Sequence, residues 1–175
     1  MPQASEMLWP WWVRLSHWLV ASGVIALWLM SYVWYETDWL HRLVGYAVLA
    51  LVAARILLGC LTKVSSARFS LPRWHAIRAH IAEMQQRKIT PHQGHNPVGQ
   101  WAVYLIWLLI AALALTGWLS RTDALWGEDW PVEVHGLLSW TLLAVIVVHV
   151  AAVICVGQWS RQHLVRQMWH GRFEK

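Results

Sequence analysis

The sequence predicts an all-α fold, an integral membrane bundle of four helices. The chain of 175 residues is 58% hydrophobic and has a mean hydropathy of +0.39. Only 13% of its residues are charged, which is about half the share usual in a soluble domain. Four apolar segments also reach the roughly 20 residues that a helix needs to cross a bilayer. We therefore expect residues 1–175 to form a single membrane domain surrounded by lipid.

The predicted spans cover residues 12–34, 39–61, 98–120 and 132–157. The first apolar run is too long for the core of a signal peptide, and no small-residue cleavage site follows it, so we expect it to remain in the mature protein. Tryptophans near the span ends are typical of interfacial belts. They are Trp9, Trp11, Trp12, Trp34, Trp39, Trp126, Trp130 and Trp159.

The charges between the spans predict their orientation. The connection between spans two and three carries Lys63, Arg68, Arg73, Arg78, Arg87 and Lys88, and the tail carries Arg161, Arg166, Arg172 and Lys175. The other two connections carry Glu36, Asp38, Asp123, Glu128, Asp129 and Glu133. The positive-inside rule then places both termini in the cytoplasm. The formal charge of +5 fits this topology better than a nucleic-acid partner.

The connection between spans two and three contains a further predicted helix. In "LPRWHAIRAHIAEMQQRKI", the apolar residues Trp74, Ile77, Ile81 and Met84 recur at helical spacing, and most of the cations lie elsewhere. This pattern indicates an amphipathic helix on the inner membrane surface. A solvated basic connector is the alternative.

Four of the ten histidines lie within or at the ends of the spans: His17, His41, His135 and His149. The orientation puts His41 and His135 near the outer face. His149 follows His135 by fourteen residues, which corresponds to about 21 Å along a helix and to nearly the same side of it. His149 therefore lies at the depth of His17, near the inner face, and the span histidines form two pairs.

Two neutral imidazoles on opposing helices suit the axial positions of a haem iron, and two such ligands favour electron transfer over oxygen binding. Zinc would need more ligands, usually with cysteine or carboxylate help. All nine acidic residues lie in the loops and tails or, as Glu133 does, at the very end of a span, which also argues against a cation-coupled transporter. Hydrogen bonding between helices is the alternative role for these histidines.

Three other residues fit haem sites at these depths. Arg55 lies inside span two at the depth of the inner pair, and Arg14 lies one turn before His17, so each could bind a haem propionate. Snorkelling to the headgroups is the alternative for Arg55. Gly45, one turn after His41, would let a flat macrocycle approach the backbone, although helix packing alone would also explain this glycine.

The spans resemble one known family across nearly the whole chain. The segments "VRLSHWL", "LHRLVGYAVLALVAARILLG", "GHNPVGQWAVYLIWLLIAALALTGW", "VHGLLSWTLLAVIVVHVAAV" and "LVRQMWHGR" are similar to the bacterial cytochrome b561 and nickel–iron hydrogenase b-type cytochrome superfamily. The resemblance implies a four-helix bundle that holds two b haems on His17, His41, His135 and His149. It also makes His95 a candidate near the inner haem or a quinone pocket. Hydrogenase cytochromes often add a helix, which weakens the expectation of a hydrogenase partner.

The main hypothesis is transmembrane electron transfer in a respiratory chain, between ubiquinone or menaquinone and a c-type cytochrome or another oxidoreductase subunit. The first alternative is a superoxide oxidase that passes electrons to quinone. Such an enzyme would favour a cationic outer face, whereas the outer face here is acidic. The second alternative is a haem-free membrane adaptor. The sequence leaves open both the direction of electron flow and the formation of a homodimer.

Overall fold

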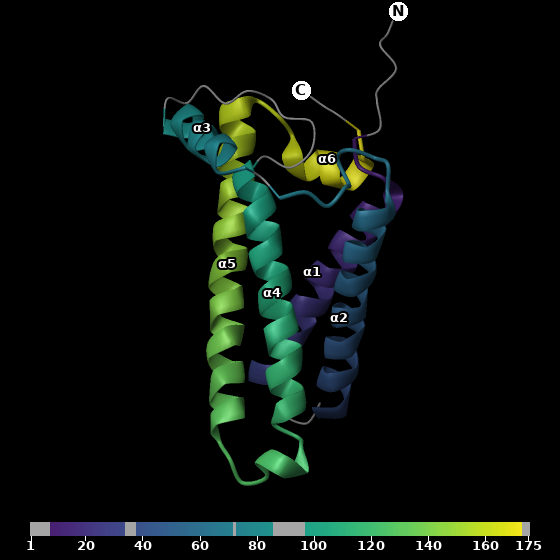
Figure 1. The fold of residues 1–175 in the computed structure, drawn as a ribbon, viewed down its shortest axis with the longest axis vertical. Helices are drawn as coiled ribbons and strands as arrows, with labels where there is room; N and C mark the ends of the chain where they lie inside the picture. Colours follow the sequence, from purple (N-terminus) through teal and green to yellow (C-terminus); the bar gives the residue numbers. More distant parts are fainter. Residues whose placement is uncertain (1–7, 34–37, 72, 86–96, 173–175) are drawn as a thin grey trace, which may run out of the picture.

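The computed structural model describes residues 8–33, 38–71, 73–85 and 97–172. Four long helices dominate: α1 (Trp11–Tyr32), α2 (Asp38–Leu61), α4 (Pro97–Leu119) and α5 (Trp130–Ser160). Each is long and apolar enough to cross a membrane, and together they form an elongated bundle (Figure 1). The predicted all-α, four-helix membrane fold is therefore confirmed.

The bundle consists of two helical hairpins. Helix α1 packs chiefly against α2 and α4 against α5, while a smaller contact between α2 and α4 joins the pairs (Figure 1). Gly23 allows α1 to approach α2 closely, because a Cβ atom there would lie 2.5 Å from Cγ2 of Val48. Small residues at such crossings let helix backbones pack tightly in a membrane, where van der Waals contact drives association.

The centre of the bundle is apolar. Val48 and Val52 of α2, Leu109 and Ile110 of α4, and Leu142 of α5 are buried together. Only 6% to 17% of each span is buried, so most apolar side chains of the spans face outward. In water this surface would be strongly unfavourable, whereas in lipid it needs no partner. The buried core is therefore a narrow layer at mid-height.

One end of the bundle, which we call the cationic end, carries α3 (Trp74–Gln85) and α6 (Leu164–His170) across it (Figure 1). Helix α3 lies in the connection for which the sequence predicts an amphipathic helix, and its place on a membrane surface stays a prediction. The backbone N–H of Leu8 donates to the carbonyl of Gly171 at 2.8 Å, so the described start and end of the chain meet there. Gly171 has a φ of +77°, which an L side chain rarely adopts, and a Cβ atom there would lie 2.8 Å from the Trp9 carbonyl oxygen.

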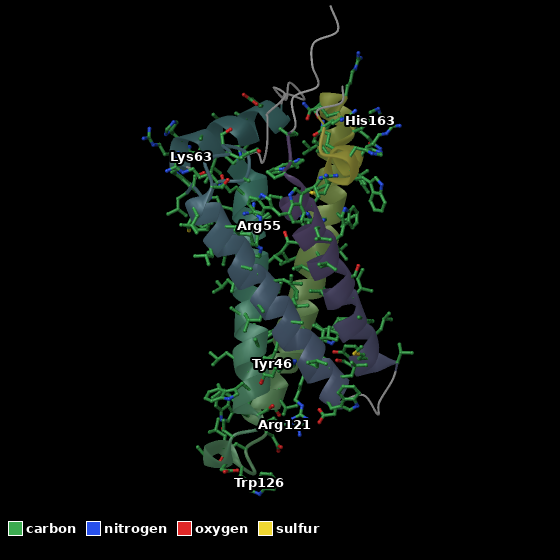
Figure 2. The ribbon with its side chains drawn as sticks, turned by 90° about the vertical axis from the view of Figure 1, so that its right-hand side faces the viewer. Tyr46, Arg55, Lys63, Arg121, Trp126 and His163 are labelled. Atoms are coloured by element: carbon green, nitrogen blue, oxygen red, sulfur yellow. The ribbon has the colours of Figure 1, made fainter. Side chains whose placement is uncertain are left out.

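The opposite end, which we call the acidic end, carries Asp38 and the connection between α4 and α5. That connection contains the short 3-10 helix η1 (Asp123–Leu125). The guanidinium of Arg121, at the end of α4, pairs with the carboxylate of Asp38, at the start of α2, and thereby links the hairpins. Figure 2 shows Arg121 and Trp126 at this end, and Lys63 and His163 at the cationic end. Both charged ends flank an apolar middle, as a membrane protein requires.

We predict that Gly23→Val separates α1 from α2 and destabilises the bundle by about 1–3 kcal/mol, the usual cost of overpacking. Thermal unfolding in detergent, followed by tryptophan fluorescence, measures the effect as a lower Tm. Ser22→Val adds the same kind of side chain at an exposed neighbouring position and should leave the Tm nearly unchanged. Equal Tm values for the two variants would contradict the proposed close contact.

Candidate functional site

His41 of α2 and His135 of α5 face each other near the acidic end. Their ring centroids lie 6.2 Å apart, with an interplanar angle of 62°. Both side chains are partly buried, and they come from different hairpins. A metal–imidazole bond is about 2 Å long, so rings at this separation leave room for one metal ion between them.

The Nδ1 atom of His135 is already hydrogen-bonded within the bundle. It lies 3.1 Å from the carbonyl oxygen of Leu113 and 3.0 Å from Oγ1 of Thr116. A carbonyl oxygen can only accept, so Nδ1 carries the proton and donates it. The other ring nitrogen, Nε2, is then unprotonated and available as a metal ligand.

His41 has a matching environment on the other hairpin. Its Nδ1 lies 3.3 Å from Oγ of Ser31. The Ser31 hydroxyl donates to the Leu27 carbonyl at 3.0 Å. Each of these two histidines, near the start of one helix, therefore meets a hydroxyl on the helix before it, and His135 also meets a carbonyl there.

His17 of α1 and His149 of α5 are the other two histidines of the spans, and both are partly buried toward the cationic end. The ring of His17 also contacts Trp18 edge-on, with centroids 5.1 Å apart. Within the described chain, Nδ1 of His17 is buried without a hydrogen-bond partner. A buried ring nitrogen without a partner is costly in an apolar environment. A polar or metal-containing group bound at this site would reduce that cost.

Arg55 lies within the bundle below the cationic end (Figure 2). Its guanidinium lies 4.9 Å from the ring centroid of Trp12 and 5.9 Å from that of Trp107. It donates to the carbonyl of Ala67 at 3.1 Å. The side chain therefore turns toward the protein, where two indole faces and one carbonyl bind it.

The other predicted site residues have different surroundings. Arg14 donates to the carbonyl of Trp169 at 2.7 Å, and so binds the last turn of α6. Gly45 has open space beside it, because a Cβ atom there would meet only Leu27 Cδ2, at 3.9 Å. His95 lies outside the described residues.

The sequence interpretation missed the residues that hold the histidines. Ser31 and Thr116 are hydroxyl residues inside apolar spans, and this is the signal that could have found them. Gly117 could not have been recognised in this way. Its role is steric, because a Cβ atom there would lie 3.3 Å from Cε1 of His135.

Among the described residues, no three His, Cys, Asp or Glu side chains gather as a metal site. His41 and His135 instead form a facing pair, which suits a metal group that already carries most of its own ligands. Haem needs only two axial ligands from the protein, so the donor set fits this cofactor.

The comparison with protein families gives one finding that covers most of the chain. The family model described as prokaryotic cytochrome b561 matches residues 8–171. No curated protein and no solved structure matches the sequence. The match includes both histidine pairs.

Proposed function

The chain belongs to the prokaryotic cytochrome b561 family, and on this premise we propose that it carries electrons across the membrane through two bis-histidine b haems. Membership establishes the coarser statement that this is a multi-pass membrane protein, which binds b-type haem and transfers electrons. The number of haems, their ligands and the electron partners are the content of the proposal.

The axial ligands that we propose are His41 and His135 at the acidic end, and His17 and His149 at the cationic end. The observation that carries the proposal is the facing pair of rings with centroids 6.2 Å apart. In that pair, hydrogen bonds at Nδ1 of each ring favour Nε2 as the ligand atom. A bound haem supplies reversible one-electron chemistry at its iron.

The apolar core of the bundle separates the two proposed haem sites. Leu142 lies seven residues from His135 and seven from His149, and it is buried in the apolar core. This core therefore lies between the two proposed sites and excludes water and ions from the space between them. Burial of this kind is one of the ways in which a protein sets a haem potential.

Arg55 is the residue that we propose as a partner for a haem propionate at the cationic-end site. It lies on the same helix as His41, fourteen residues further along. A charged guanidinium inside a span is expensive unless an anion or an aromatic face stabilises it. Arg14 is the second candidate, although its contact with Trp169 also serves the packing of α6. We also propose that Gly45 lets the haem macrocycle approach the backbone of α2.

We place the cationic end in the cytoplasm of a bacterium and the protein in the inner membrane. Lys63, Arg68, Arg73 and Arg161 at this end support that orientation. The proposed reaction moves electrons between ubiquinone or menaquinone and a redox partner such as a c-type cytochrome or another oxidoreductase subunit. A contribution of His95 to quinone binding stays a prediction.

The acidic end does not favour superoxide as a substrate. Its described arginines, Arg42 and Arg121, both approach the carboxylate of Asp38, Arg42 at a distance of 3.8 Å. Steering of a small anion needs a surface with positive potential. Here the arginines are offset by a carboxylate, and Asp123, Glu128, Asp129 and Glu133 add further negative charge.

We predict that the purified protein carries two b haems per chain and that His149→Ala lowers this number to about one. The variant loses one ligand of the cationic-end site and keeps both ligands of the other. A pyridine haemochrome assay, normalised to protein, measures the ratio. His75→Ala, an exposed histidine of α3, is the matched control and should keep both haems.

Two results would contradict this assignment. A wild-type protein with no reduced b-type α-band, after expression with ample haem, would exclude the haem function altogether. Loss of the acidic-end haem alone in His149→Ala would show that the histidines do not pair by depth.

The orientation gives a separate prediction. In a chain with Cys60→Ser and Cys155→Ser, we expect Trp126→Cys to react with a membrane-impermeant maleimide added outside intact spheroplasts. Trp126 is 88% exposed at the acidic end. His75→Cys, on α3 at the cationic end, should react only after lysis. The reverse pattern would show that the acidic end faces the cytoplasm.

A further inference from the structure

The same hydrogen-bonded arrangement occurs in both hairpins near the acidic end. On α1, the Ser31 hydroxyl donates to the Leu27 carbonyl and lies 3.3 Å from Nδ1 of His41. On α4, the Thr116 hydroxyl lies 2.9 Å from the Ala112 carbonyl and 3.0 Å from Nδ1 of His135. In each case a hydroxyl on one helix meets the ring at the start of the following helix.

The backbone carbonyls determine which atom donates in these hydrogen bonds, because a carbonyl oxygen can only accept. The Leu113 oxygen lies 3.1 Å from Nδ1 of His135 and also 3.1 Å from Oγ1 of Thr116. Nδ1 must donate, because its carbonyl partner can only accept. The Thr116 hydroxyl gives its hydrogen to a backbone carbonyl and offers a lone pair to the Nδ1 hydrogen. Ser31 can do the same for His41, since its own hydrogen is bonded to Leu27.

We propose that Ser31 and Thr116 are positioning residues that fix the ring tautomer of His41 and His135 and lower the reduction potential of the haem between them. This inference rests on the proposed haem ligation. Hydrogen bonding from Nδ1 makes the imidazole a stronger electron donor to a metal at Nε2. Stronger donation favours the oxidised iron, and therefore lowers the potential.

Packing makes this arrangement specific. Thr116 is only 7% exposed, so its hydroxyl has little access to water and its bonds within the protein are well defined. Gly117 leaves the space that the His135 ring occupies, because a Cβ atom there would lie 3.3 Å from Cε1 and 3.5 Å from Nδ1. Helix α4 thus offers a hydroxyl, a carbonyl and a gap within two turns.

The other histidine pair lacks this feature on one ring. Nδ1 of His17 has no hydrogen-bond partner within the described chain. The effect of the hydroxyls is therefore local to the acidic-end site, and the haem at the cationic end serves as an internal reference in the same molecule.

The test is redox potentiometry of the purified, full-length, haem-loaded protein, followed at the α-band. We expect Thr116→Val to keep both haems and to raise the potential of the acidic-end haem alone. The expected shift is several-fold in the ratio of reduced to oxidised haem at a fixed potential, where tenfold corresponds to about 59 mV. Thr116→Ser restores the hydroxyl and should return the wild-type value. The same measurement on His149→Ala, which retains only the acidic-end pair, assigns the potential to its site.

Two further variants sharpen the test. Thr141→Val is the matched control, because Thr141 is exposed and its hydroxyl bonds the Leu137 carbonyl of its own helix. It should leave both potentials unchanged. Ser31→Ala should shift the acidic-end haem in the same direction as Thr116→Val but less, since Ser31 is the more distant hydroxyl and is exposed. Ser31→Ala also tests the inference on its own if Thr116→Val fails to retain haem.

Unchanged or lowered potentials in Ser31→Ala, and in Thr116→Val where it holds haem, would overturn the positioning role while leaving the haem ligation intact. A shift in Thr116→Val that Thr116→Ser does not reverse would also overturn it, because the shift would then come from packing. A wild-type protein without haem at the acidic end would instead overturn the proposed function, and this inference with it.

Discussion

Ring nitrogens inside an apolar bundle need hydrogen-bond partners, and at the acidic end this constraint underlies the arrangement of the spans. A polar atom left unpaired in hydrocarbon costs several kcal/mol. At the acidic end the constraint is met by carbonyls that already belong to helices. A helical carbonyl has a second lone pair after its own backbone bond, and Leu113 uses it for the ring of His135. Positioning of the histidines therefore requires no break in the helices.

The hairpin architecture follows from the same need. The histidine near the start of the second helix of a hairpin lies beside the last turns of the first helix, so each hairpin can hold its own histidine. His41 is held by α1 and His135 by α4. Bringing the two hairpins together then makes the rings face each other at 6.2 Å. The ion pair between Asp38 and Arg121 joins the hairpins at this end, although it is exposed and contributes little to stability.

The sequence predicts the bundle well because the bilayer leaves few alternatives. Length and hydropathy define the four helices, and charge defines their proposed orientation. The spacing of His135 and His149 predicts two levels along α5, since helical geometry is regular. The hydrogen bonds could not be predicted in this way. Contact between Thr116 and His135 depends on the rotation of α4 against α5, which side-chain packing sets. The surroundings of Arg14 depend in a similar way on the position of α6, which is separated from it by most of the chain.

The two hairpins position their histidines with different residues. Ser31 bonds the carbonyl four residues earlier, whereas Thr116 lies within reach of carbonyls three and four residues earlier. Any small hydroxyl residue on the correct face of the first helix of a hairpin can make such a bond. The similarity is therefore one of geometry: a hydroxyl, a carbonyl of the same helix, and a ring at the start of the next. His17 lies on α1, and none of the described residues hydrogen-bonds its Nδ1. Its ring packs instead on Trp18, which in turn contacts Trp169 of α6. The two ends of the bundle thus present chemically different surroundings to the same kind of side chain, and this difference would give the two proposed haems unequal potentials.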